Sequence, residues 1–539
     1  MSGSITLENR FGVNKMELIS LKYAIFVIVL LVLYYCFPKK YRWYVLLAGS
    51  MAYYVIICKW YVLFIIFTIC TTYGSTIWID KLLKKQNAIV KSHKEDWDRQ
   101  TRKEYKEKGR KKRVAVMLFA LLCNFGILAF LKYIPYAGEL GLLLPLGISF
   151  YTFQSMGYVM DVYREIVEPE KNFLKVALFV SFFPQIIQGP IAIYDKLAGQ
   201  LYEGHSLRLE NLQKGALLVL WGVMKKLVIA DRAVNIINFV MDKPMDFSGT
   251  YVFFAAVVYA LQLYADFSGG IDIVRGIAEM FGITMSTNFN HPYFSRSLTE
   301  YWHRWHMTLG DWCRNYIFYP LSISKRFLNF GKWLKPRFGA HISKVLPGCI
   351  ASVITFIVIG VWHGANMKYL YFGLWNGIVI MLAELFAPVN KKVAGGFFKL
   401  TGLREKGIFA TIVSVLWTFM LILVGYYFDI AENASTAFHM LFKSVTDFHI
   451  SELGINNIIL NLGACGLDEY DILLLIICTL LWFFISFVEE NKKLDMRDFI
   501  LSRKLPLRWA IIYLGIFIVI IFGYYGPGVN PADFVYMQF

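Results

Sequence analysis

Long apolar runs alternate with short polar or basic stretches along most of the chain. Many of these runs approach the ~20 residues that an α-helix needs to cross the hydrocarbon core of a membrane. We predict about eleven or twelve crossings, because short and broken runs add to the regular ones. The runs cover residues 21–37, 44–58, 61–79, 114–131, 140–160, 345–367, 369–386, 408–428, 472–488 and 509–525. The run over residues 140–160 is interrupted by Pro145, Gly147 and Gly157.

Two apolar segments are interrupted by residues that do not suit a straight crossing helix. Residues 173–193 contain two prolines, a glycine and the amides Gln185 and Gln188. Such a segment is expected to be re-entrant or kinked, which is tolerated at membrane depth only inside protein or beside a wet cavity. Residues 212–230 contain Lys225 and Lys226 within an apolar pattern, so they either span the membrane or lie flat as an amphipathic helix.

The middle of the chain predicts helices joined by turns. Residues 251–267 are expected to form a helix that enters a turn at Gly269 and Gly270, followed by a short helix over residues 271–281. Asp272 and Arg275 are three apart on that helix, a spacing at which they can pair. Residues 286–297 predict a loop, and residues 321–344 a basic amphipathic connection.

Composition identifies the class of protein. The chain is 57% hydrophobic and 17% charged, with a mean hydropathy of +0.50, whereas an ordinary soluble domain has ~25% charged residues. We therefore predict an all-α polytopic membrane protein that forms one integral membrane domain. Within it we expect N-terminal helices and a basic loop over residues 1–113, a core over residues 114–390, and C-terminal helices with an aromatic tail over residues 391–539.

Much of the net charge of +17 is concentrated in residues 81–113, where fourteen Lys and Arg stand against five Asp and Glu. Beside a membrane-spanning helix, such an excess is typical of a cytoplasmic loop, and it can also contact anionic lipid. We therefore expect a solvated cytoplasmic loop and no nucleic-acid partner.

Several chemistries lack their sequence signals. The eight cysteines include no C-x-x-C pair and lie mostly in apolar runs, so we expect small buried hydrophobic residues, with neither a disulfide framework nor a zinc site. The chain has no G-x-S-x-G, H-E-x-x-H or P-loop motif, which argues against serine hydrolases, zincins and nucleotide-driven motors.

His363 lies near the end of residues 345–367, a stretch without Asp, Glu, Lys or Arg. An ionisable side chain within or at the edge of a span costs free energy and usually faces protein or water. Two interpretations stay open: a histidine that packs at a helix end, or a general base that accepts the proton of an attacking hydroxyl, worth ~10²–10⁴-fold in rate. Gly360 and Gly364 would let a substrate or another helix approach closely.

A second polar segment, residues 301–320, contains His303 and His306, which share a face if the segment is helical. They could both be interfacial, within an aromatic belt of Trp302, Trp305 and Trp312. A metal site would instead combine them with Glu300 or Asp266, although the spacing is a weak signal. In a third interpretation, His306 lies in the reaction chamber as an orienting or second titratable group.

The remaining polar candidates each have a structural alternative. Arg304 and Arg314 either bind a phosphate or carbonyl oxygen, or extend to the membrane surface. Asp266, at the end of an apolar run, is expected to orient other groups and to pair with a histidine or Arg275. Gln185 and Gln188 would line a polar tunnel or hydrogen-bond between helices.

Five stretches together resemble the membrane-bound O-acyltransferases, above all their bacterial alginate O-acetyltransferase branch. The resemblance is carried by residues 144–164, 179–191, 264–283, 288–321 and 361–365, which include FFPQIIQGPI, YADFSGGID and VWHGA. The histidine that defines the family corresponds to His363, and its usual second histidine to His306. His303 has no family role, and Asn315 stands where relatives carry Asp.

The resemblance implies a ring of tilted helices around a central tunnel, with His363 and His306 as catalytic residues and no tightly bound cofactor or metal. The donor would be acetyl-CoA or an acyl-carrier thioester on the cytoplasmic side of a bacterial plasma membrane, and the acceptor a polysaccharide outside. An extracytoplasmic SGNH-like acetyltransferase would be a partner, with Tyr536 as a possible acyl relay. Residues expected to line the tunnel or orient substrates are Asp266, Gln185, Gln188, Trp302, Trp305, Arg304, Arg314 and Asn366.

Three other functions stay open on the sequence. One is D-alanyl transfer from a carrier protein to a cell-wall polymer. Another is a glycan or lipid transporter that uses His363 for proton coupling, which would consume no thioester. The last is a structural scaffold, in which replacing both histidines would change little.

Overall fold

The structure is a computed structural model that describes residues 18–134, 138, 142, 144–401, 404, 407–454, 457, 465–526 and 534. These residues form helices joined by turns, and no strand occurs among them. The predicted all-α architecture is therefore confirmed. The chain divides into two compact units: unit 1 comprises residues 1–219 and 271–286, and unit 2 comprises residues 220–270 and 287–539.

The two units reflect how the chain packs, and they do not assign a function to either part. The predicted boundaries at residues 113 and 390 stay a prediction, because the division into units does not test them. The ring of helices and the central tunnel also stay predictions.

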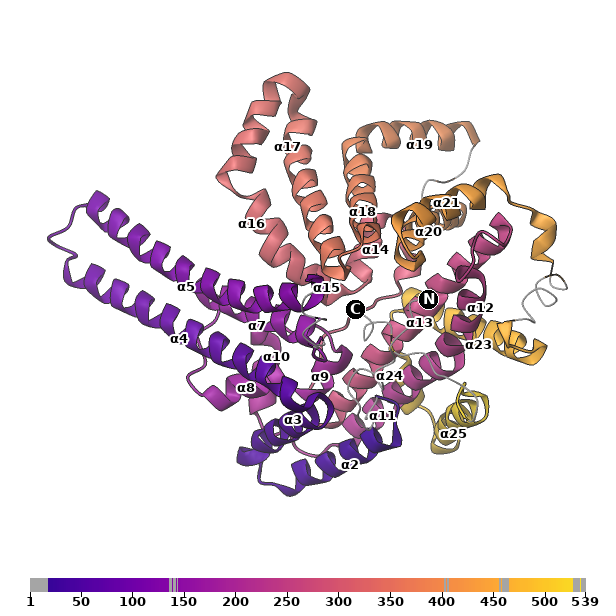
Figure 1. The fold of residues 1–539 in the computed structure, drawn as a ribbon, viewed down its shortest axis with the longest axis horizontal. Helices are drawn as coiled ribbons and strands as arrows, with labels where there is room; N and C mark the ends of the chain where they lie inside the picture. The colour runs from indigo at the N-terminus through magenta and orange to yellow at the C-terminus, as the bar shows by residue number, and fades with distance from the viewer. Residues whose placement is uncertain are drawn as a thin grey trace. The chain divides into compact units, whose positions relative to one another are not determined.

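Unit 1 is built on a group of packed helices in which α4 contacts α5, α7 and α8 (Figure 1). Helix α7 is buried along almost its whole length. The helices of unit 1 are α2 (Leu21–Cys36), α3 (Arg42–Cys58), α4 (Val62–Ser92), α5 (Arg99–Tyr133), α7 (Ile148–Tyr163), α8 (Phe173–Ser181), α9 (Phe183–Gln188), α10 (Tyr194–Tyr202) and the first part of α11 (Leu209–Met224).

The segment over residues 81–113, expected as a basic cytoplasmic loop between two spans, is mostly helical and forms a hairpin of α4 and α5 (Figure 1). Its position on the cytoplasmic side stays a prediction. Only residues 93–98 connect the two helices. Lysine, arginine, glutamine and glutamate are good helix formers, and Asp98 caps α5 by accepting from the Thr101 N–H at 2.9 Å. Gln86 of α4 donates to the Lys106 carbonyl of α5 at 3.3 Å, so the polar ends of the helices also pack together.

The interrupted segment over residues 173–193 is broken as predicted. Helix α8 ends at Ser181, and α9 begins at Phe183 after a break at Phe182. All six residues of α9 are buried. The approach of α9 to the start of α7 requires a glycine, because a Cβ at Gly147 would overlap the Ile186 carbonyl, and Gly147 has a φ of 70°.

Unit 2 contains the remaining helices. Among them, α17 and α18 pack closely side by side in the upper part of Figure 1. Its principal helices are α12 (Asp231–Met241), α13 (Gly249–Met280, up to Gly270), α14 (Leu298–Arg304), α15 (Met307–Cys313), α16 (Tyr319–Ser322), α17 (Lys325–His363), α18 (Met367–Leu385), α19 (Ala387–Thr401), α20 (Ile408–Ile430), α21 (Ala434–Thr446), α23 (Glu469–Lys492), α24 (Met496–Leu501) and α25 (Leu505–Phe522). Two π-helical turns, η3 (Lys225–Ala230) and η5 (Arg314–Phe318), complete it.

The turn predicted at Gly269 and Gly270 is wrong. Helix α13 runs without a break from Gly249 to Met280. The glycine at 269 serves a close approach instead, because a Cβ there would lie 2.9 Å from the Gly222 carbonyl oxygen. The predicted pair of Asp272 and Arg275 is present in unit 1 at 3.4 Å.

The connection predicted over residues 321–344 is largely helical and forms the first arm of α17. The helix bends at Gly339, whose φ of 81° interrupts the helical backbone. The second arm ends at His363. It approaches α18 so closely that a Cβ at Gly360 would overlap the Tyr369 carbonyl oxygen, which confirms that this glycine permits helix contact.

The structure confirms a multi-pass membrane protein. Within the described residues, seven helical stretches are long and apolar enough to cross a membrane, or eight if the bent pair α18 and α19 counts as one span. One of these stretches, Lys39–Ser92, contains two of the predicted crossings, separated at Lys59 by a left-handed φ of 49°. The total of eleven or twelve crossings stays a prediction.

Candidate functional site

A small cavity in unit 2 brings together His306 and His363. Its volume is about 30 Å³, which is room for one or two water molecules. Six helices and the turn at His306 supply its wall: Leu263, Phe267, Tyr301, Trp302, Trp305, His306, Leu309, Ile359, His363, Phe372, Asn376, Ile422, Tyr426 and Asp429. The two predicted catalytic histidines, and both predicted tryptophans, therefore meet at one place.

His363 is the last residue of α17. Its ring packs against three aromatic rings, with centroids 5.0 Å from Trp362, 5.5 Å from Phe372 and 5.9 Å from Tyr369. The carbonyl end of a helix carries a partial negative charge, which favours a cation. The position of His363 therefore stabilises an imidazolium once the ring accepts a proton.

His306 lies between α14 and α15 and is only 2% exposed. Its φ of 44° is left-handed, which is unusual for a residue with a side chain. Nδ1 lies 3.1 Å from the Asn288 Oδ1, and the ring packs edge-on to Phe267 at 4.9 Å. Burial, and then the neighbouring His363, lowers the pKa of His306 to about 3, so this ring is neutral near pH 7.

The metal site considered above required His303 and His306 to share one helical face, and the structure does not place them so. Helix α14 ends at Arg304, so His303 and His306 do not lie on one helix, and their three-residue spacing does not place them on a shared face. Glu300 pairs with Arg304 at 2.6 Å instead. The described part of the chain contains no group of three His, Cys, Asp or Glu side chains that could hold a metal ion.

The aromatic wall of the cavity is held by directed hydrogen bonds. The Trp302 Nε1–H donates to the Asn376 Oδ1 at 3.0 Å. The Tyr293 hydroxyl donates to the Ala260 carbonyl at 2.6 Å. Because that hydroxyl has one proton, it accepts from Tyr426 at 3.1 Å, and Tyr426 in turn accepts from Tyr301 at 2.7 Å.

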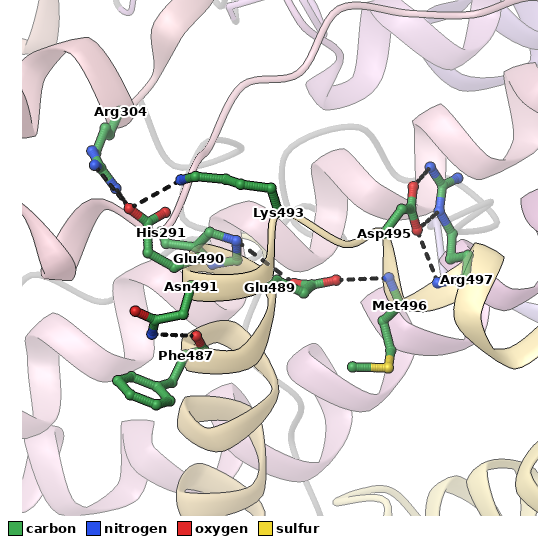
Figure 2. Close-up of polar contacts among 10 residues, drawn as sticks. All are labelled: His291, Arg304, Phe487, Glu489, Glu490, Asn491, Lys493, Asp495, Met496 and Arg497. Carbon is green, nitrogen blue, oxygen red and sulfur yellow. Dashed lines mark hydrogen bonds and ion pairs between the residues drawn. The ribbon is translucent and has the colours of Figure 1, made fainter.

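Arg304 does not reach the cavity wall. It forms ion pairs with Glu300 and, at 3.0 Å, with Glu490 near the end of α23, and Lys493 joins Glu490 at 3.5 Å (Figure 2). The neighbouring His291 faces Glu489 at 3.7 Å (Figure 2). Neither predicted role, phosphate binding or extension to the membrane surface, is needed to explain this arginine. Arg314 likewise pairs with Asp311, and both are about two-fifths exposed.

Asp266 is fully buried and its partner is not the predicted one. Its Oδ1 lies 2.7 Å from the Lys226 Nζ, and the same ammonium lies 2.8 Å from the Asp231 Oδ1. The expectation of a histidine or Arg275 is therefore wrong, because the π-helical turn η3 packs its lysines against α13. The Lys225 Nζ similarly donates to the Ser268 hydroxyl at 2.8 Å.

The other predicted residues lie outside this cavity. Gln185 and Gln188 belong to unit 1, where Gln185 donates to the Pro190 carbonyl at 3.0 Å. Asn366 caps α18 by accepting from the Lys368 N–H at 3.1 Å. Tyr536 lies outside the described residues.

Sequence reasoning missed several residues of the site. Asp429 lines the cavity and accepts from the Tyr259 hydroxyl at 2.7 Å. Since it ends the apolar run over residues 408–428, the rule that identified His363 would also have identified Asp429. Asn288, Asn376 and Tyr426 carry no comparable signal, because amides and tyrosines are common in such segments.

Comparison with known proteins identifies the family. Residues 169–335 match the model of the MBOAT, membrane-bound O-acyltransferase family. The chain carries a membrane-bound O-acyltransferase domain. The resemblance predicted from the sequence is confirmed. His306 lies inside the matched part of this domain and His363 beyond it.

Individual relatives extend the similarity beyond the matched domain. It is 30% identical over 340 residues to the probable alginate O-acetylase AlgI of Pseudomonas putida, covering 62% of this chain and 61% of the relative. It is 29% identical over 363 residues to a peptidoglycan O-acetyltransferase of Helicobacter pylori, covering 60% and 63%. A teichoic acid D-alanyltransferase of Bacillus subtilis is 26% identical over 288 residues, covering 52% and 67%. The matches thus span somewhat more than half of the O-acetylating relatives' length.

Proposed function

We propose that this protein is a membrane O-acyltransferase that transfers an acetyl group from a cytoplasmic thioester to a hydroxyl of an extracytoplasmic polysaccharide. Relatives named as alginate O-acetylase and peptidoglycan O-acetyltransferase support acetyl transfer to a polysaccharide. The observation that carries the proposal is that two histidines with opposite positions relative to the helix dipoles meet at one cavity.

The setting of each histidine suggests its role. His363 ends a long helix, where the helix dipole favours a cation, whereas His306 precedes the N-terminus of α15, where the dipole disfavours one. Two titratable groups whose surroundings favour opposite protonation states can take separate acid and base roles. We therefore assign proton acceptance to His363 and a neutral, orienting role to His306.

The proposed reaction balances with these groups alone. The acceptor hydroxyl gives its proton to His363 while its oxygen attacks the carbonyl carbon of the thioester. The tetrahedral intermediate then loses the thiolate as the carbon–sulfur bond breaks. The thiolate takes the proton from the His363 imidazolium, which leaves an ester and a free thiol.

The size of the cavity agrees with this chemistry. Its volume of about 30 Å³ matches the reacting hydroxyl and carbonyl, not two whole substrates. The rest of each substrate therefore has to extend away from the cavity. We propose acetyl-CoA or an acyl-carrier thioester as the donor.

The test is thiol release and label transfer from radiolabelled acetyl-CoA by purified protein in lipid vesicles. His363→Gln should lower the rate by ~10²-fold or more. His341→Gln is the matched control, because His341 is an exposed histidine in the same helix α17. A folded His363→Gln variant with full thiol release would refute the proposal, and transport of a glycan without thioester consumption would favour a transporter.

The same experiment tests the route that the acetyl group takes after it leaves the cavity. Label on Tyr536, on an SGNH-like partner or directly on polymer would distinguish a relay from direct transfer. We propose a bacterial plasma membrane with residues 81–113, which include the connection between α4 and α5, in the cytoplasm. A cysteine introduced at Lys94 should then react with an impermeant maleimide only in inside-out vesicles.

The D-alanyltransferase relatives support a second candidate, transfer of D-alanine from a carrier protein. This candidate predicts that a pantetheine-loaded carrier protein binds more tightly than free CoA. Competition between the two donors in the thiol-release assay decides between them.

A further inference from the structure

Asn288 is a fully buried amide whose oxygen is shared by several donors on one turn. Its Oδ1 accepts from the backbone N–H of Thr308 at 3.1 Å and from the Thr308 hydroxyl at 2.9 Å. The same oxygen lies 3.1 Å from the His306 Nδ1. Asn288 itself has no exposed surface.

The backbone around this amide holds the turn at His306 in place. The Met307 N–H donates to the Asn288 carbonyl at 2.9 Å, and the Asn290 N–H donates to the Arg304 carbonyl at 3.0 Å. The two bonds lie on either side of the left-handed residue His306. A backbone conformation of this kind costs ~1–3 kcal/mol and persists only where its surroundings over-determine it.

These contacts determine which end of the Asn288 amide faces His306. A backbone N–H can only donate, so the atom that it contacts must be the amide oxygen and not the amide nitrogen. An amide oxygen can only accept. The His306 Nδ1 that faces this oxygen must therefore carry a hydrogen.

In a neutral imidazole only one nitrogen carries hydrogen, so Nε2 holds a lone pair. A ring in this tautomer can accept a hydrogen bond through Nε2. It cannot donate one there to a developing oxyanion, which needs an N–H. The tautomer thus decides what His306 can do in the cavity.

We propose that Asn288 is a positioning residue that fixes the Nδ1–H tautomer of His306 and thereby makes Nε2 a hydrogen-bond acceptor in the cavity. On this assignment, His306 orients the acceptor hydroxyl or the protonated base, and it does not stabilise the oxyanion. The catalytic part of this inference rests on the acyl transfer proposed above. The tautomer itself does not.

Asn288→Asp separates this role from a structural one. A carboxylate has the shape of the amide and can accept all three hydrogen bonds, so the turn keeps its contacts. Its negative charge, however, favours the imidazolium form of His306. Below the raised pKa the ring is charged and Nε2 carries a hydrogen, so acceptor function is lost as the pH falls.

The other titratable groups on the cavity wall are His363, Tyr301, Tyr426 and Asp429. All of them are unchanged in the variant. The new carboxylate also favours the charged form of His363, so the nitrogen-15 signals of His306, and not the rate profile alone, assign the shift to this ring. We expect the pKa of His306 to rise from about 3 by at least one pH unit, so that on acidification the variant loses activity at least one pH unit earlier than wild type and recovers it as the pH is raised.

Thr308→Val is the matched control. It removes the hydroxyl that donates to the same oxygen, but it leaves the contact of His306 with Asn288 and the Thr308 N–H. The acid limb of the rate profile should stay in place. An equal shift in both variants would show that Asn288 acts only through the fold of the turn, and would overturn the proposal.

A second readout does not require activity. Nitrogen-15 NMR of histidine-labelled protein distinguishes an N–H nitrogen from one with a lone pair, and comparison with His306→Gln assigns the signals. Neutral wild type should show hydrogen on Nδ1 of His306, and in Asn288→Asp the second nitrogen should become protonated at a pH at least one unit higher than in wild type. Hydrogen on Nε2 in neutral wild type would overturn the inference, whereas the expected tautomer in a protein without thioester activity would overturn only the proposed function.

Discussion

Replacing Lys226 by methionine would remove the cation from a buried group of charges in unit 2. The Lys226 Nζ lies 2.7 Å from the Asp266 Oδ1 and 2.8 Å from the Asp231 Oδ1, and none of the three side chains is more than 3% exposed. Removing one partner of a buried ion pair costs ~3–5 kcal/mol, because water cannot hydrate the charge that remains. Here two carboxylates remain, so we expect a loss at the upper end of this range at pH 8.

The loss should shrink on acidification. Burial raises the pKa of Asp231 to about 6 against the opposing effect of Lys226, and without that cation the carboxyl would bind a proton at still higher pH. A carboxyl whose pKa is higher in the folded than in the unfolded state stabilises the fold when protonated, so stability rises as the pH falls through the folded value. The apparent melting temperature, measured by size-exclusion fluorescence after heating, should therefore recover between pH 8 and pH 5.

Two controls make this prediction refutable. The triple variant Lys226→Met, Asp231→Asn, Asp266→Asn removes all three charges and should regain most of the lost stability. Lys214→Met removes a partly exposed lysine that pairs with Glu210 along one helix, and should cost less than ~0.5 kcal/mol. An apparent melting temperature of Lys226→Met equal to that of wild type at pH 8 would contradict the prediction. So would a triple variant that is no more stable than the single variant.

Two further substitutions test the packing around the cavity. Gly360→Ala should cost ~1–3 kcal/mol, because its Cβ would overlap the backbone of α18, whereas Gly348→Ala in the same helix meets nothing within 4 Å and should be neutral or slightly stabilising; melting temperatures compare the two. Tyr426→Phe removes the middle hydroxyl of the chain from Tyr301 to Ala260 and should cost ~1–3 kcal/mol. Tyr319→Phe on the surface is its control, and equal melting temperatures of the two tyrosine variants would contradict a stabilising role for this chain of hydrogen bonds.

Much of the site could be predicted because its central residues are chemically unusual where they stand. His363 ends a stretch without charged residues, and His306 lies between tryptophans. The structure places both on one cavity together with Trp302 and Trp305. Asp429 satisfies the same criterion as His363, because it directly follows an apolar run.

The errors arose where the pattern of one segment was interpreted without its neighbours. Two adjacent glycines, at 269 and 270, suggested a turn, yet Gly269 permits a close approach to Gly222 within a continuous helix. A dense run of charges suggested a loop, yet residues 81–113 form the polar ends of two paired helices. In both cases a helix was favoured by contacts with another part of the chain.

The sequence by itself determined the class of this protein, its helical segments and the identity of its two histidines. These properties depend on local quantities, namely the length of apolar runs and the cost of an ionisable group within them. Only the tertiary structure decided that Lys226 is the partner of Asp266, and that Asn288, eighteen residues before His306, sets its tautomer. A buried polar group must bond to whatever donor or acceptor lies within about 3 Å, and the packing of distant segments, not the local pattern, determines which one that is.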